Sequence, residues 1–161
     1  MEESLTVPTA TTVRAVPAKL LIENRSAINK YLASTRGGKV SFTHIIGYAV
    51  IRAVAAMPSM NVTYNVDEKG KPVAVHNAHV NFGLAIDIPR PDGSRNLVVP
   101  NIKGAEQLSF REFWDAYNDI VKRGRNGALT IEDFRGTTVS LTNPGGIGTV
   151  HSVPRLSKGQ A

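Results

Sequence analysis

The run TNPGGIG, from Thr142 to Gly148, holds the residue types in this chain that are best suited to chemistry. It puts a hydroxyl and an amide at the point where a predicted strand ends and a glycine-rich turn begins. A hydroxyl at a strand end can donate a hydrogen bond to a developing oxyanion, and glycines let a substrate approach the backbone closely. We therefore predict a catalytic donor at Thr142. By proximity, the candidate substrate-binding residues are Asn143, Gly145, Gly146 and Gly148.

The glycine run does not match the common nucleotide-binding loops. Its spacing is not Gly-x-Gly-x-x-Gly and no helical pattern follows it, so a dinucleotide-binding turn is not supported. No Walker sequence occurs in the chain. Glycine-rich turns after strands are common and most bind nothing. On spacing alone, a purely structural turn therefore stays open as the alternative.

The four histidines and one aspartate are further candidates. We expect His44, in the first turn of a buried helix, to be a structural residue. His76 and His79 flank a turn without another ligand at zinc spacing, so no metal site is predicted. A surface or packing role is favoured for His151 over that of a general base. Asp87 is expected near the site, orienting a catalytic group or forming a buried ion pair, with Arg14 as one possible partner.

Composition predicts one soluble globular domain. The 161 residues are 42% hydrophobic and 20% charged. The absence of cysteine excludes disulfides and thiolate catalysis and fits a cytoplasmic protein. The first residues lack a signal-peptide pattern, and the longest apolar stretch, around Ile45–Met57, is too short to span a bilayer. We therefore expect no membrane partner.

The net charge of +6 favours polyanionic partners, including nucleic acid or a phosphate-bearing cofactor. The one basic cluster, Lys122, Arg123 and Arg125, suits the negative end of a predicted helix. No aromatic residues interleave with a basic run, so a nucleic-acid surface is not favoured.

Periodicity predicts the elements that must position the site. Helices are expected over Ala18–Ser34, with one face buried, and from the N-cap Ser41 to Pro58. A third helix begins at the capping box of Ser109 and Glu112. Strands are expected at Thr9–Val16, Asn61–Tyr64, Pro72–Val75, His79–Ile88, Asn96–Val99 and Gly136–Thr142, and a helical turn at Ile131–Phe134.

The strand His79–Ile88 carries the clearest pattern. Its large apolar residues alternate with Asn81, Gly83, Ala85 and Asp87, so one face is built for packing and the other leaves room for a ligand or another chain. A turn at Pro89–Gly93 makes a hairpin with the following strand. The order of elements favours an α/β class (an α+β two-layer sandwich), with a mixed sheet covered by helices. Residues 1–8 are expected to be a disordered or linker start, and residues 9–161 one domain.

Three blocks resemble a known family. The segments SFTHIIGYAVIRAVAAMPSMN, NFGLAIDIP with NLVVPNIK, and GTTVSLTNPGGIGTVHSVP follow the order found in the catalytic domain of the 2-oxoacid dehydrogenase acyltransferases. Further details, such as VPTATTVRAVPAKLL, are most similar to the acyltransferase segment fused to the bacterial 2-oxoglutarate dehydrogenase/decarboxylase polypeptide.

The resemblance implies a chloramphenicol-acetyltransferase-like fold, a homotrimer, and succinyl transfer between dihydrolipoamide and coenzyme A. Thr142 matches the family's hydroxyl donor to the oxyanion. The implied cofactors are coenzyme A as substrate and a lipoyl group on a partner domain, with thiamine diphosphate and magnesium only in a full-length fused dehydrogenase. The implied partners are the 2-oxoglutarate dehydrogenase module and dihydrolipoyl dehydrogenase.

One departure from the family pattern concerns the general base. The family's histidine lies in a His-x-x-x-Asp-Gly block, which these 161 residues do not contain. We therefore expect a partial domain, truncated at its C-terminus and starting late at Met1, with exposed sheet edges and no turnover alone. The alternatives are a non-catalytic trimerising scaffold of a fused 2-oxoglutarate dehydrogenase and, less favoured, a nucleic-acid-binding domain.

Overall fold

The computed structural model describes residues 9–89, 92–145, 148–154, 156 and 159–161. The predicted linker start at residues 1–8 lies outside this part. The helices are α1 (Lys19–Ser34), α2 (Phe42–Ala56) and α3 (Phe110–Arg125), with short 3-10 turns η2 (Pro58–Met60), η3 (Ala105–Gln107) and η4 (Ile131–Asp133). The strands are β1 (Val62–Val66), β2 (Pro72–His76), β3 (Phe82–Leu84), β4 (Ile86–Pro89), β5 (Arg95–Val98), β6 (Asn101–Ile102) and β7 (Val139–Leu141).

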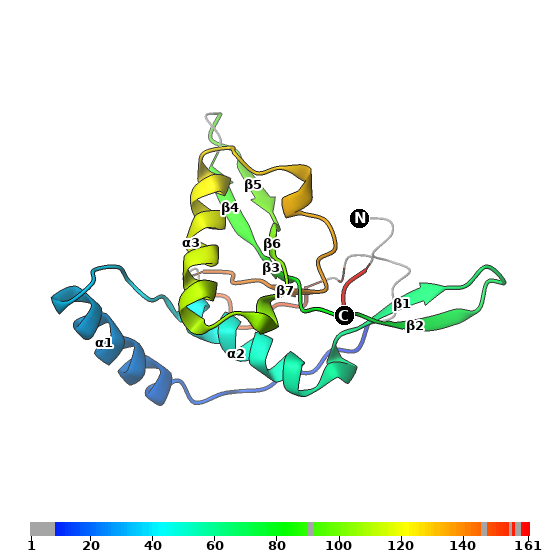
Figure 1. Cartoon of the computed structure of the whole chain (residues 1–161), viewed down its shortest axis with the longest axis horizontal. Coiled ribbons are helices and arrows are strands. Elements are labelled where there is room, and N and C mark those ends of the chain that lie inside the picture. The colour runs from blue at the N-terminus through cyan, green and yellow to red at the C-terminus, as the bar shows by residue number, and fades with distance from the viewer. Residues whose placement is uncertain (1–8, 90–91, 146–147, 155, 157–158) are drawn as a thin grey trace.

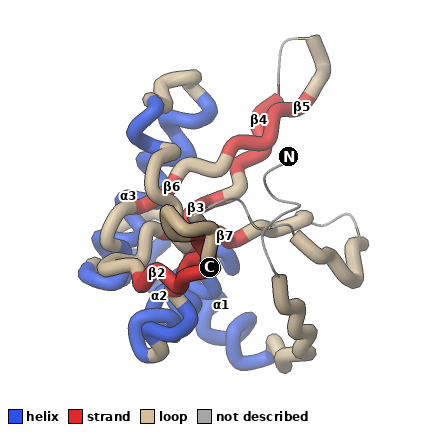
Figure 2. Tube along the Cα trace, turned by 90° about the vertical axis from the view of Figure 1, so that its right-hand side faces the viewer, coloured by secondary structure: helices blue, strands red, loops and turns tan. Residues whose placement is uncertain are grey.

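The central sheet has the strand order β6-β3-β7 and is mixed, as predicted. Strand β3 pairs with β6 antiparallel and with β7 parallel, the latter from Phe82↔Val139 to Leu84↔Leu141. Helices α2 and α3 lie beside these strands, while the β1–β2 hairpin projects away from them (Figure 1). In the turned view β4 and β5 extend away from the group formed by β3, β6 and β7 (Figure 2).

The core forms where α2 and α3 meet β3. Phe82 and Phe113 are fully buried, with ring centroids 5.9 Å apart in an edge-to-face arrangement. A Cβ added at Gly47 would lie 3.1 Å from the Phe82 ring, so this glycine allows α2 to approach the strand. The predicted burial of Val80, Phe82, Leu84 and Ile86 is confirmed. The expectation of a buried helix is met on one face of α2 only, since His44, Gly47, Ile51 and Val54 are buried while Ile46 is 41% exposed.

Helix α3 begins as its sequence predicts. The Ser109 side chain accepts the hydrogen bond of Glu112 N, and Glu112 Oε2 accepts that of Ser109 N at 2.8 Å, which completes the capping box. At the other end the three basic residues of the cluster occupy the last turn. Arg123 there binds both Asp119 and Asp133. The helix terminus therefore accounts for the basic cluster.

Two hairpins flank the sheet. Strands β4 and β5 pair from Ile86↔Val98 to Pro89↔Arg95, which confirms the predicted hairpin. Strands β1 and β2, predicted as separate strands, also pair with each other, from Val62↔His76 to Val66↔Pro72. The single strand expected over His79–Ile88 is instead two strands. Its path changes at Ala85, where β4 leaves the central sheet to pair with β5.

Two expectations for the first part of the chain are wrong. Residues 9–18 form no strand and are exposed, because the β-branched run there has no neighbouring strand to pair with among the described residues. Helix α1 forms as predicted but buries no residue. Two of its side chains contact the segment where α2 begins. The Asn29 amide is hydrogen-bonded to the backbone O and N of Val40, and the Arg25 guanidinium lies 4.1 Å over the Phe42 ring.

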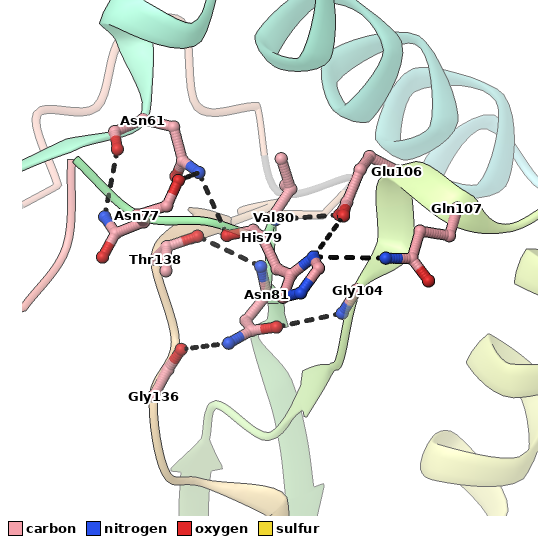
Figure 3. Close-up of polar contacts among 10 residues, drawn as sticks. All are labelled: Asn61, Asn77, His79, Val80, Asn81, Gly104, Glu106, Gln107, Gly136 and Thr138. Atoms are coloured by element: carbon pink, nitrogen blue, oxygen red, sulfur yellow. Dashed lines mark hydrogen bonds and ion pairs between the residues drawn. The ribbon is translucent and has the colours of Figure 1, made fainter.

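Sequence patterns did not predict β6 or η3. Polar contacts connect both elements to the start of β3. Glu106 accepts hydrogen bonds from Val80 N at 2.8 Å and pairs with His79 Nδ1 at 2.7 Å (Figure 3). Asn81 bridges Gly136 O and Gly104 N through its amide (Figure 3). These contacts tie β3 to the segments before α3 and β7. Among the described helices none is long and apolar enough to cross a membrane.

Candidate functional site

The candidate donor lies at the carboxyl end of β7. Leu141, the last strand residue, pairs with Leu84 and accepts a hydrogen bond from Ala85 N at 3.2 Å. Thr142 follows immediately and is exposed. The end of a half-buried, paired strand therefore fixes the backbone up to the hydroxyl-bearing residue.

The turn after Thr142 is built by its own sequence. Asn143 Oδ1 accepts a hydrogen bond from Gly145 N at 2.9 Å. The ring of Pro144 fixes its own φ angle. Gly145 has φ +77°, the left-handed value that glycine adopts without strain. Gly148 is exposed, whereas the predicted binding residue Gly146 lies outside the described residues.

A groove of about 560 Å³ separates this turn from the beginning of α2. Phe42, Thr43 and Ile46 line it on the helix side, and residues 141–145 on the other. Apolar side chains, the exposed Thr142 and the half-buried Thr43 therefore line the same space, which suits an acyl chain that ends in a reactive carbonyl. Sequence reasoning missed the α2 residues, because nothing in the pattern links them to a turn 100 residues away.

The open face expected beside β3 is filled. A Cβ added at Gly83 would lie 2.5 Å from Ser140 Oγ and 2.8 Å from Thr137 Cγ2. The small residue at position 83 therefore serves the close packing of neighbouring protein side chains. At this position the expectation of room for a ligand is wrong.

Asp87 forms an ion pair, but with a different partner. Its Oδ2 lies 2.6 Å from Arg95 Nε across the β4–β5 hairpin. The suggested pairing with Arg14 is wrong, since Arg14 instead donates to Val13 O. The pair is also not buried, with 45% of the Asp87 side chain exposed, because β4 projects from the central sheet.

The other histidines contact residues other than Thr142. His79 binds Glu106 at the start of β3, and exposed His76 ends β2. Exposed His151 borders a separate hollow together with residues 9–14 and Met60. Among the described residues, no cluster of three metal-ligating side chains occurs.

His44 has the structural role that the sequence predicted. Its Nδ1 accepts a hydrogen bond from Ser41 N at 2.9 Å, in the place that glutamate usually takes in a capping box. This acceptor role requires an unprotonated Nδ1. The ring is 4% exposed and packs edge-on against Tyr117 at 4.2 Å. Burial lowers the pKa of His44, and a hydrogen bond with Asn118 only partly opposes this.

We predict that acid weakens α2 through His44. Because its pKa is lower in the folded chain than the 6.5 of a free imidazole, the unfolded state binds the proton first, and stability is lost as the pH falls through and below 6.5. A lost cap costs about 0.5–2 kcal/mol. Urea unfolding at several pH values, followed by the fluorescence of Trp114, measures how the free energy of unfolding changes with pH.

The variant His44→Gln keeps an acceptor without the titration and should flatten this part of the pH profile. The exposed His76→Gln is the matched control and should leave the profile unchanged. An equal slope in His44→Gln and the unaltered chain would contradict the assignment.

The sequence comparisons identify the family of the chain. Residues 1–161 match the family described as 2-oxoacid dehydrogenases acyltransferase (catalytic domain). The chain belongs to this family. Over 160 residues it is 60% identical to the 2-oxoglutarate dehydrogenase E1/E2 component of Corynebacterium glutamicum and 61% identical to the multifunctional 2-oxoglutarate metabolism enzyme of Mycolicibacterium vanbaalenii. Each match covers 99% of this chain but 13% of the relative.

Solved structures show the same fold. A probable dihydrolipoamide acetyltransferase of Listeria monocytogenes superposes with a TM-score of 0.83 at 25% identity, covering 99% of this chain and 64% of that one. The dihydrolipoamide acetyltransferase of Azotobacter vinelandii gives a TM-score of 0.79 at 22% identity, covering 96% and 60%. The predicted family and fold class are therefore confirmed for this acyltransferase domain.

Proposed function

We propose that this chain forms part of a dihydrolipoamide succinyltransferase domain, with Thr142 as the hydrogen-bond donor to the oxyanion. The observation that carries the proposal is the exposed hydroxyl at the end of β7, beside a groove lined by apolar side chains. Family membership supports acyl transfer, and the names of the relatives support a 2-oxoglutarate-derived acyl group.

The proposed chemistry follows from the groove. The coenzyme A thiolate attacks the thioester carbonyl of succinyl-dihydrolipoamide, and the carbonyl oxygen becomes negatively charged. The Thr142 hydroxyl donates a hydrogen bond to that oxygen, which lowers the barrier because charge develops there. The intermediate then collapses with expulsion of the dihydrolipoamide thiolate. The base for the attacking thiol would come from a histidine outside these 161 residues.

The proposal also names substrates and partners. Coenzyme A and a lipoyl group on another domain are the substrates, and thiamine diphosphate with magnesium would act in a fused dehydrogenase part. The proposed assembly is a homotrimer that works with a 2-oxoglutarate dehydrogenase module and dihydrolipoyl dehydrogenase. Likeness to the cubic core of a pyruvate dehydrogenase complex supports an oligomer. The cysteine-free composition supports a cytoplasmic location.

The direct test is an assay of the full-length polypeptide that carries this chain. It is incubated with coenzyme A and succinyl-dihydrolipoamide, and succinyl-coenzyme A is measured by chromatography. Formation of the product at a rate that saturates with both substrates is the expected result. No product from an intact, folded polypeptide would favour the non-catalytic scaffold instead.

A further inference from the structure

A hydrogen bond between distant segments holds the turn at the candidate site. Asn143 Nδ2 donates to Thr43 Oγ1 at 3.3 Å, joining the end of β7 to the first turn of α2. The same side chain accepts from Gly145 N through Oδ1. Asn143 therefore shapes the turn with one end and attaches it to α2 with the other.

Thr43 is itself well placed to act as a fixed point. It lies between Ser41 and His44, whose reciprocal hydrogen bonds close the first turn of α2. The ring of His44, the next residue, packs against Tyr117 of α3 at 4.2 Å between centroids, and Tyr117 packs against Phe113 at 6.1 Å. Thr43 therefore lies in a helix start that is held by its own cap and by packing against α3.

The turn has little other support. Residues 142–145 are exposed. In the part of the chain that the structure describes, the contact with Thr43 is the only side-chain hydrogen bond from these four residues to another element. Because an oxyanion donor works through preorganisation, a displacement of the turn by a fraction of an ångström would reduce its effect on the reaction.

We propose that Thr43 is a positioning residue of the acyl-transfer site, which fixes Asn143 and thereby the place of the Thr142 hydroxyl in the groove. The proposal rests on the function proposed above. Thr43 acts through Asn143 and is not itself a donor to the oxyanion. The second hydrogen on Asn143 Nδ2 remains available to a substrate.

The test uses the full-length polypeptide with Thr43→Val, which keeps the shape of the side chain and removes the hydroxyl. We expect kcat for succinyl transfer to fall about tenfold, the size of one neutral hydrogen bond, with the KM for coenzyme A little changed. Thr43→Ser should restore kcat to within about twofold. The exposed Thr12→Val is the matched control and should behave like the unaltered protein.

A double variant separates positioning from general destabilisation. If Thr43 acts through Asn143, then Thr43→Val combined with Asn143→Ala should lose no more activity than Asn143→Ala alone. The proposal would be overturned if the losses of activity in the two single variants multiplied in the double variant. It would also be overturned if kcat of Thr43→Val stayed within about twofold of that of the unaltered enzyme.

Hydrogen exchange supplies a readout that does not need activity. Thr43→Val should speed deuterium uptake in the peptide that spans residues 139–145 while leaving α3 unchanged. Faster uptake in a polypeptide without any transferase activity would support the contact and overturn only the proposed function. Unchanged uptake there would overturn the positioning role, whatever the activity.

Discussion

Replacing Thr142 by alanine is expected to lower kcat for acyl transfer in the full-length polypeptide about 10- to 1,000-fold. Thr142 carries the exposed hydroxyl at the end of β7, and alanine leaves the developing oxyanion without this donor. Binding should change far less, because the hydrogen bond strengthens only as charge develops in the transition state. Steady-state kinetics with coenzyme A and succinyl-dihydrolipoamide measure both effects.

Two substitutions at the same position serve as controls. Thr142→Ser retains the hydroxyl and should keep most of the activity, whereas Thr142→Val retains the shape and should resemble alanine. A Thr142→Ala enzyme with unaltered kcat would remove this residue from the catalytic site. A loss in Thr142→Ser as large as in Thr142→Ala would assign the residue a packing role instead.

Replacing Gly83 by alanine is expected to lower the free energy of unfolding by about 1–3 kcal/mol. The new methyl group would lie 2.5 Å from Ser140 Oγ and 2.8 Å from Thr137 Cγ2, so these side chains and the segment 137–141 that carries them must shift away from β3. Because Thr142 follows β7 directly, this shift should also reduce acyl transfer. Urea unfolding followed by the fluorescence of Trp114, the one tryptophan of the chain, measures the stability.

Gly124→Ala is the matched control for that substitution. Gly124 is also buried, yet a Cβ there would lie no closer than 3.5 Å to its nearest neighbour, Leu129. Since alanine favours a helix over glycine, this variant should keep or raise the stability, by up to about 1 kcal/mol. Equal behaviour of Gly83→Ala and Gly124→Ala would contradict the proposed close contact between β3 and β7.

Local sequence determined the elements whose signals lie within a few residues. The capping box of Ser109 begins α3 and the N-cap Ser41 begins α2, both as predicted, because a helix start depends on side chains about three positions apart. Alternation along residues 80–86 identified the apolar side chains that enter the core, but not the burial of Gly83 between them. The segment 9–16 has equally strong β-branched composition but forms no strand, since a strand also needs a partner.

At the site, the sequence by itself determined the local structure of the turn. The run Thr142–Gly145 carries its hydroxyl, its proline and the glycine with positive φ in order, so the strand end and the turn follow from the residues alone. Tertiary structure decided which residues face that turn. The Thr43–Asn143 contact and the groove beside it join segments 100 residues apart through the fold, and spacing along the chain carries no signal for such contacts.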